Sequence, residues 1–231
     1  MSTGRSASAL RGAFARHATA WLYLAGVCAA EITYALLPGH DRDAVLAWTS
    51  TSVHNLEHHP VGCLVASAFF PTSFLLAWPV VIALAMFAAI SVLGSWRTAL
   101  TCAAGHVVGT VVSEGIVAYR IAHGSLPPAD RFLLDVGPSY VVMAAVAIAL
   151  LYGRWPARTA AAIDLVLLIF VGQIFAGLSR LEVAAVGHLT ALITGAVTAT
   201  FFVWHRRRKA RVLNRLRFRI LGLSTARWLL N

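Results

Sequence analysis

Two polar side chains of complementary chemistry lie a few residues inside the outer ends of two apolar segments. Ser139 follows Gly137-Pro138 at the start of one segment, and His188 follows Gly187 in another, with Gly195 two turns later. A serine hydroxyl is a poor nucleophile unless a base within hydrogen-bond reach takes its proton. Burying a polar side chain in a bilayer costs free energy. A residue that can act as a nucleophile together with one that can act as a base therefore indicates a functional site.

The two residues have similar predicted depths in the membrane. The chain enters the bilayer at about Asp135 and again at about Leu181, so Ser139 lies roughly four residues inside and His188 roughly seven. At about 1.5 Å per residue, their heights differ by a few ångströms. Taken singly, each residue is also explained as a structural hydrogen-bonding group in a membrane helix. The paired depths favour the catalytic interpretation.

Composition places these residues in a membrane protein. The 231-residue chain is 59% hydrophobic and 12% charged, unlike an ordinary soluble domain. A spanning helix needs about 20 apolar residues, and six stretches approach that length: 21–37, 74–94, 99–119, 136–151, 160–178 and 183–203. The sequence therefore predicts an all-α polytopic membrane protein built as a six-helix bundle.

Arginine placement predicts the orientation. The predicted inner side carries Arg5, Arg11, Arg16, Arg97, Arg154, Arg158 and a basic tail, and the outer side carries Arg42, Arg120, Arg131 and Arg180. By the positive-inside rule, we expect a multi-pass protein of the cell membrane with both termini in the cytoplasm. The predicted organisation is a cytoplasmic segment 1–18, a membrane domain 19–204 and a basic cytoplasmic tail 205–231. The scarcity of lysine beside abundant arginine indicates a GC-rich bacterial genome.

The net charge of +10 is concentrated in that tail. Nine of the nineteen Lys and Arg residues follow His205. No aromatic residues interleave a basic face as in nucleic-acid-binding modules, so we expect no nucleic-acid partner. We expect the tail to contact anionic lipids of the inner leaflet instead.

The chain resembles the rhomboid family of intramembrane serine proteases in three places. Gly137-Pro138-Ser139-Tyr140 is similar to the family's Gly-x-Ser-Gly motif in the fourth helix, and His188 with Gly195 to the His and spaced glycines of the sixth. Ser67-Ala68-Phe69-Phe70 is similar to the element that enters the second helix. The resemblance covers roughly 21–203. It implies that Ser139 and His188 form a catalytic dyad acting on transmembrane helices, without a cofactor.

The sequence departs from this family where an oxyanion would be held. Leu76 and Val80 occupy the positions of a His and an Asn that usually donate there, and Tyr140 and Ala191 replace two motif glycines. Loss of one such donor typically costs about 100- to 1,000-fold in turnover. We therefore expect either a slow protease or an inactive protein that binds transmembrane helices. A small transporter is a third class, but no internal repeat or path of charges supports it.

Five further residues have predicted supporting roles. Gly137 would let backbone approach a substrate, with Tyr140 as a weaker support, and Gly187 and Gly195 would let the sixth helix pack close to the fourth. Glu114 has a height near that of Ser139. It either orients His188 and supports the oxyanion, or pairs with interior polar groups, as His106 would, to stabilise packing.

Two other polar groupings have simpler interpretations. Asp164 is expected to pair with Arg158 near the inner end of the fifth segment. His54, His58 and His59 lie in the long outer connection 38–73 with Glu57 between them, which resembles a metal site only if that stretch is helical. No fourth ligand is evident, so we favour a solvated or interfacial histidine cluster and predict no metal. The apolar stretch 61–70 in the same connection is expected at the membrane interface.

Overall fold

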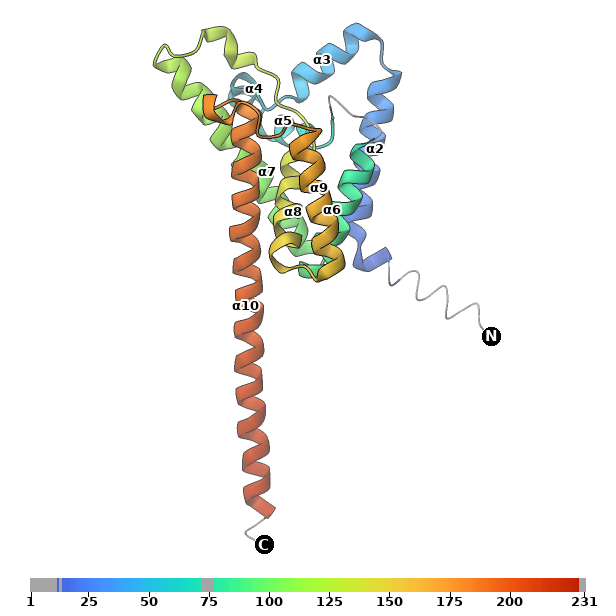
Figure 1. The fold of residues 1–231 in the computed structure, drawn as a ribbon, viewed down its shortest axis with the longest axis vertical. Helices are drawn as coiled ribbons and strands as arrows, with labels where there is room; N and C mark the ends of the chain where they lie inside the picture. Colours follow the sequence, from blue (N-terminus) through green and yellow to red (C-terminus); the bar gives the residue numbers. More distant parts are fainter. Residues whose placement is uncertain (1–11, 13, 72–76, 229–231) are drawn as a thin grey trace, which may run out of the picture.

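The fold is a bundle of helices. The computed structural model describes residue 12 and residues 14–71 and 77–228, with side chains described as far as Leu213. In this part of the chain all regular structure is helical, which confirms the predicted all-α membrane fold. Three described helices are long and apolar enough to cross a membrane: α2 (Ala18–Leu36), α7 (Ser95–Ala122) and α10 over Val183–Leu213. The shorter α6 (Trp78–Leu93), α8 (Ser139–Tyr152) and α9 (Trp155–Phe170) pack among them (Figure 1).

Helix α8 is the centre of the bundle, in contact with α6, α7, α9 and α10. The ten residues from Tyr140 to Ala149 are all buried. Such a run of alanine and branched apolar side chains has no polar face, and a helix of this kind is stable only when it is surrounded. Fourteen residues span only about 21 Å, less than the bilayer core. An end of α8 therefore lies inside the bundle.

Glycine allows α7 and α10 to approach α8 at backbone distance. A Cβ on Gly195 of α10 would lie 2.7 Å from the Cα of Ala144, and one on Gly105 of α7 would lie 2.6 Å from the Ala144 Cβ. Neither space admits a methyl group. Small residues on both sides of an interface are how helices pack tightly in a membrane, where no hydrophobic effect drives them together.

The outer connection folds into three short helices at one end of the bundle (Figure 1). They are α3 (Gly39–Thr49), α4 (Val53–His58) and α5 (Pro60–Ser67). The Asn55 side chain joins two of them, because its Nδ2 donates to the carbonyl oxygens of Ala47 at 2.6 Å and Ser50 at 2.8 Å. Most of the stretch expected at the interface is α5, and Val61 and Val65 on it are exposed.

The largest differences between the predicted segments and the structure are in the fifth and sixth segments. The fifth segment was expected at 160–178, but α9 begins at Trp155 and ends at Phe170, because proline suits a first helical turn and Gly172 and Gly177 follow. The sixth was expected to end at 203, yet α10 (Val183–Trp228) continues through the basic tail. Arginine, lysine and leucine are strong helix formers, so nothing in the tail stops the helix at the membrane surface.

The expected pairing of Asp164 with Arg158 is wrong. The Arg158 guanidinium donates to the carbonyl oxygen of Leu151 at 3.4 Å. Asp164 is fully buried, and neither of its carboxyl oxygens has a hydrogen-bond partner among the described residues. The two residues are six apart on one helix, which places them on different faces.

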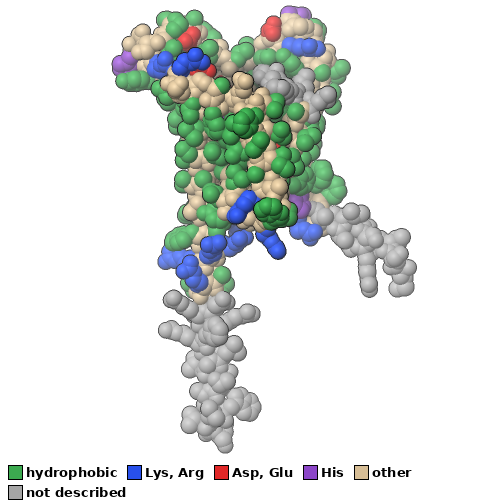
Figure 2. All heavy atoms as spheres, in the orientation of Figure 1, with side chains coloured by type: hydrophobic (Ala, Val, Ile, Leu, Met, Phe, Trp, Pro, Cys, Tyr) green, Lys and Arg blue, Asp and Glu red, His purple; other side chains and the backbone are tan. Residues whose placement is uncertain are grey.

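Charge is unevenly distributed along the bundle. The start of α2 and the free end of α10 lie at the same end of the molecule (Figure 1). Figure 2 shows many Lys and Arg side chains gathered at that end and a smaller group beside Asp and Glu side chains at the other, while hydrophobic side chains cover the flank of the bundle. An apolar flank between polar ends is the surface expected of a protein immersed in a bilayer.

Candidate functional site

Ser139 is the first residue of α8 and follows a tight turn. Gly137 in this turn has φ +137°, a backbone conformation that is costly for any residue with a Cβ. Its N–H donates to the carbonyl oxygen of Ser67 at 2.8 Å. The Ser67 segment at the end of α5 therefore determines where the serine enters the bundle.

His188 lies in the first turns of α10, and its ring has one hydrogen bond to the described residues. Its Nδ1 lies 2.8 Å from the carbonyl oxygen of Ile174, in the turn after α9. A carbonyl oxygen can only accept, so a neutral His188 carries its proton on Nδ1. The lone pair is then on Nε2, the nitrogen from which the ring can act as a base.

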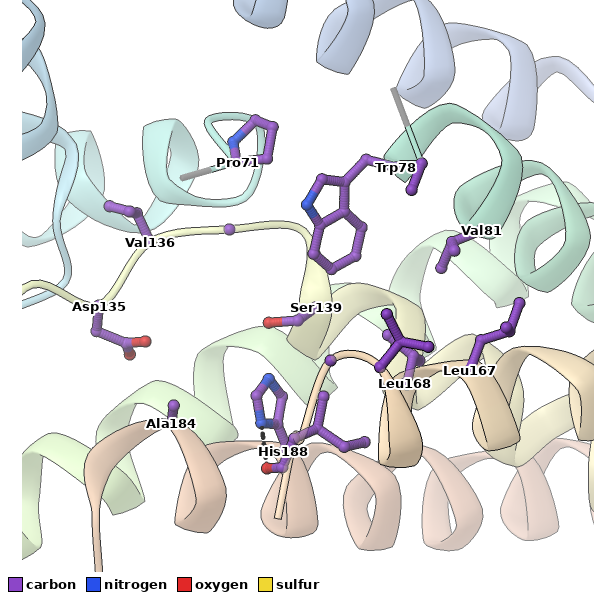
Figure 3. A pocket seen from close by; sticks show the side chains of 15 residues that line it. Pro71, Trp78, Val81, Asp135, Val136, Ser139, Leu167, Leu168, Ala184 and His188 are labelled. Carbon is purple, nitrogen blue, oxygen red and sulfur yellow. Dashed lines mark hydrogen bonds between the residues drawn. The ribbon is translucent and has the colours of Figure 1, made fainter. Parts of the chain in front are cut away.

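Ser139 and His188 line the same cavity. Its volume is about 300 Å³, and its walls include Trp78 and Val81 of α6, Leu168 of α9 and Ile174. In Figure 3 the Ser139 side chain points toward the ring edge of His188 that lies opposite the hydrogen bond to Ile174. No hydrogen bond joins Ser139 to His188 in the described part of the chain, and such bonds often form only when substrate binds.

Tyr140 forms a wall beside His188. Its hydroxyl donates to the carboxylate of Asp135, at 3.1 Å from Oδ1 and 3.0 Å from Oδ2. Its ring meets the His188 ring edge to face, with centroids 5.1 Å apart and planes at 83°. A Cβ on Gly187 would lie 2.0 Å from the Tyr140 hydroxyl oxygen. Gly187 therefore leaves the space that the tyrosine fills.

Glu114 lies outside this cavity. Its buried carboxyl lies against the backbone of Val53 and close to the carboxyl of Asp135. No hydrogen bond joins Glu114 to His188 in the described residues, and the group that orients the His188 ring at Nδ1 is the carbonyl of Ile174. His106, expected to serve packing, lies with its Nε2 2.9 Å from the carbonyl oxygen of Leu64, and so supports α5.

The two positions expected for oxyanion donors contribute none in the described structure. Leu76 lies outside the described residues, and Val80 is 58% exposed on α6, away from the cavity wall made by Trp78 and Val81. The first turn of α8 has no side-chain cap. Its leading backbone N–H groups lack acceptors within the helix, and they begin at Ser139 itself.

The histidines of the outer connection do not gather into a metal site. Helix α4 brings the rings of His54 and His58 to 4.2 Å between centroids, whereas His59 stacks on Trp48 at 5.3 Å. Across the described ranges, no three metal-binding side chains converge. Aromatic and backbone contacts account for the cluster.

Three contributors to the cavity were missed by the sequence analysis. Asp135 could have been found from the sequence, because it is an acidic residue at the predicted membrane edge, four residues before Ser139. Trp78 is an aromatic at a helix start, which by itself indicates only an interfacial residue. Ile174 contributes its backbone carbonyl, which accepts a hydrogen bond from His188. A pattern of side chains in the sequence cannot predict such a contact.

A family model described as rhomboid-like protein matches residues 13–208. The chain therefore belongs to the rhomboid-like family of membrane proteins. That family includes inactive members, so membership leaves both catalysis and helix binding open. No curated protein and no solved structure gives a significant match.

Proposed function

We propose that this rhomboid-like protein is an intramembrane serine protease with Ser139 as nucleophile and His188 as general base. The observation that carries the proposal is the Nδ1 hydrogen bond of His188 to Ile174. It leaves Nε2 as the acceptor on the ring edge that faces Ser139 across the shared cavity (Figure 3). A nucleophile, a base and a group that orients the base are the parts this chemistry needs.

In the proposed reaction, a locally unwound substrate helix places a peptide carbonyl in the cavity. The Ser139 oxygen adds to the carbonyl carbon as its proton passes to Nε2 of His188, which then protonates the departing amine. Water, activated by the same nitrogen, hydrolyses the acyl-serine and regenerates the hydroxyl. Backbone N–H groups in the first turn of α8 are the donors available for the oxyanion.

Slow turnover is part of this proposal. Leu76 and Val80 lack the side-chain donors that their positions usually provide. Each missing donor removes about 100- to 1,000-fold from the rate. The chain would then need long residence of the substrate helix to achieve cleavage.

The alternative function is recognition of transmembrane helices without cleavage. It is favoured by these same missing donors and by the lack of a hydrogen bond between Ser139 and His188 among the described residues. The cavity walls from α6 and α9 would contact a helix equally well in this case. A client helix in the bilayer is the partner in both proposals.

A serine-directed fluorophosphonate tests the proposal. We expect the probe to label Ser139 of the full-length protein, and Ser139→Ala and His188→Ala to abolish labelling. Ser91→Ala is the control, because in the described structure that hydroxyl donates to the carbonyl oxygen of Ala88 within α6. Unlabelled but folded wild-type protein that still captures a transmembrane helix would instead support the recognition function.

We also propose that both termini are cytoplasmic and that the protein lies in the cell membrane. The gathering of Lys and Arg at the end where α2 starts and α10 leaves supports this (Figure 2). Reporter fusions after Asn231 should be active in the cytoplasm, and cysteine labels at His54 to His59 should react from outside. An external C-terminus contradicts the orientation.

The helical tail is proposed to hold anionic inner-leaflet lipid. Exposed basic residues line its first turns beyond the membrane: Arg206, Arg207, Arg208, Lys209 and Arg211. Each contributes about 1 kcal/mol near a negative surface. The full-length protein should retain anionic lipid through purification at low salt, and a variant with these five residues changed to glutamine should retain markedly less. Equal retention by both proteins contradicts the proposal.

A further inference from the structure

Asp135 connects the serine turn to the outer connection. Its backbone N–H donates to the Ser50 Oγ at 2.9 Å, and its carbonyl oxygen accepts from the Thr51 N–H at 2.9 Å. Its carboxylate accepts from the Thr51 hydroxyl at 3.2 Å as well as from Tyr140. Ser50 and Thr51 of the outer connection therefore fix the position of Asp135, and the Asp135 carboxylate in turn binds the Tyr140 hydroxyl.

Tyr140 transmits this position to His188. A ring with one hydrogen bond, here to Ile174, keeps freedom to swing about it, and an edge-to-face neighbour removes that freedom. Tyr140 can be such a neighbour only while its own ring is held, and it lies in the space beside Gly187. Asp135 fixes the far end of that ring through the hydroxyl.

We propose that Asp135 is a positioning residue that, through the Tyr140 hydroxyl, holds the His188 ring in the orientation that Ser139 requires. This rests on the proposed protease function. Asp135 touches neither Ser139 nor the scissile bond in this role. It links the outer connection to the base through a hydrogen bond and a ring contact.

The charge state of Asp135 gives this role a pH signature. Burial raises the pKa of Asp135 to about 6, against the opposing hydrogen bonds from Tyr140 and Thr51. The other titratable groups around it are His106 and Glu114 on α7, Tyr140 on α8 and His188 on α10. Above pH 6 the ionised acid accepts more strongly from the Tyr140 hydroxyl. It also favours the positive charge that His188 gains in the reaction.

Asp135→Asn separates charge from shape, because the amide keeps an oxygen acceptor for Tyr140. We measure the rate of fluorophosphonate labelling of the full-length protein from pH 5 to pH 8. Wild type and Asp135→Asn should react equally at pH 5, and the variant should fall behind by about fivefold at pH 8, because a hydrogen bond to a charged acceptor is about twice as strong as one to a neutral acceptor. Because the two proteins differ only at residue 135, the ratio of their rates isolates the charge of Asp135.

Two companion variants complete this experiment. Tyr140→Phe removes the hydroxyl link altogether, so its loss at pH 8 should be at least as large. Ser50→Ala loosens the same turn without touching Tyr140, so its rate should change by the same factor at every pH. Identical pH profiles for wild type and Asp135→Asn would overturn the proposal.

A second measurement separates this proposal from the protease function. Diethyl pyrocarbonate acylates accessible imidazole nitrogens without any need for Ser139, and mass spectrometry locates the product on His188. Asp135→Ala and Tyr140→Phe should each raise the rate at His188 several-fold, because the ring is no longer held. If fluorophosphonate fails on wild type but these rates rise, the protease function falls and the positioning role stands. Unchanged rates at His188 overturn the positioning role.

Discussion

Alanine at Ser139 or at His188 should reduce cleavage of a transmembrane substrate to the background rate, and alanine at both should be no worse than either alone. The reason is that nucleophile and base act as one unit, so removing the first removes the function of the second. With weak oxyanion donors, we expect a loss of about 1,000-fold in kcat/KM for each variant. The measurement is cleavage in reconstituted liposomes under single-turnover conditions.

Folding must be shown separately for these variants. Ser139 is only partly buried and has no hydrogen bond to His188 among the described residues. The Ser139→Ala variant should therefore have the same melting temperature as the wild type. His188→Ala loses its bond to Ile174, at a cost of about 1 kcal/mol. Additive losses, with the double variant far below each single one, would contradict a shared mechanism.

Gly187→Ala should destabilise the protein and remove activity together. The added Cβ would lie 2.0 Å from the Tyr140 hydroxyl oxygen and 2.1 Å from its Cζ, so the ring must leave the wall beside His188. Overpacking of this kind typically costs about 1–3 kcal/mol. Thermal unfolding in detergent and probe labelling of Ser139 measure the two effects.

Gly115→Ala is the matched control on α7. No atom lies within 4 Å of a Cβ at that position, so the change should stabilise the helix by up to about 1 kcal/mol. A double-mutant cycle then tests the cause. In a Tyr140→Ala background, Gly187→Ala should cost little, because the clashing ring is gone. An undiminished cost there would show that Tyr140 is not what Gly187 accommodates.

The broad fold was predictable because it depends on local properties of the chain. Apolar runs of membrane length predict helices wherever they occur. The close approach of Gly195 to Ala144 was predictable for a similar reason, because glycine at a membrane helix interface commonly allows two helices to pack closely. Depth along a helix is also a local quantity, so Ser139 and His188 could be placed at matching heights.

Helix ends were less predictable because they depend on competing local signals and on solvent. The pattern of apolar residues extended the fifth segment into a turn that Gly172 and Gly177 terminate. The same pattern ended the sixth segment shortly before the basic tail. Helix α10 instead continues beyond the membrane, because arginine and leucine have high helix propensity.

The sequence by itself determined that a serine and a histidine lie at similar depth in a bundle of apolar helices. Only the tertiary structure decided which groups surround them: the Ile174 carbonyl on Nδ1, the Asp135 carboxylate on Tyr140, and Glu114 beside Asp135 and the Val53 backbone. Periodicity gives the face and height of a residue on its own helix. It carries no information on which distant turn packs against that face, because that choice minimises the energy of the whole bundle.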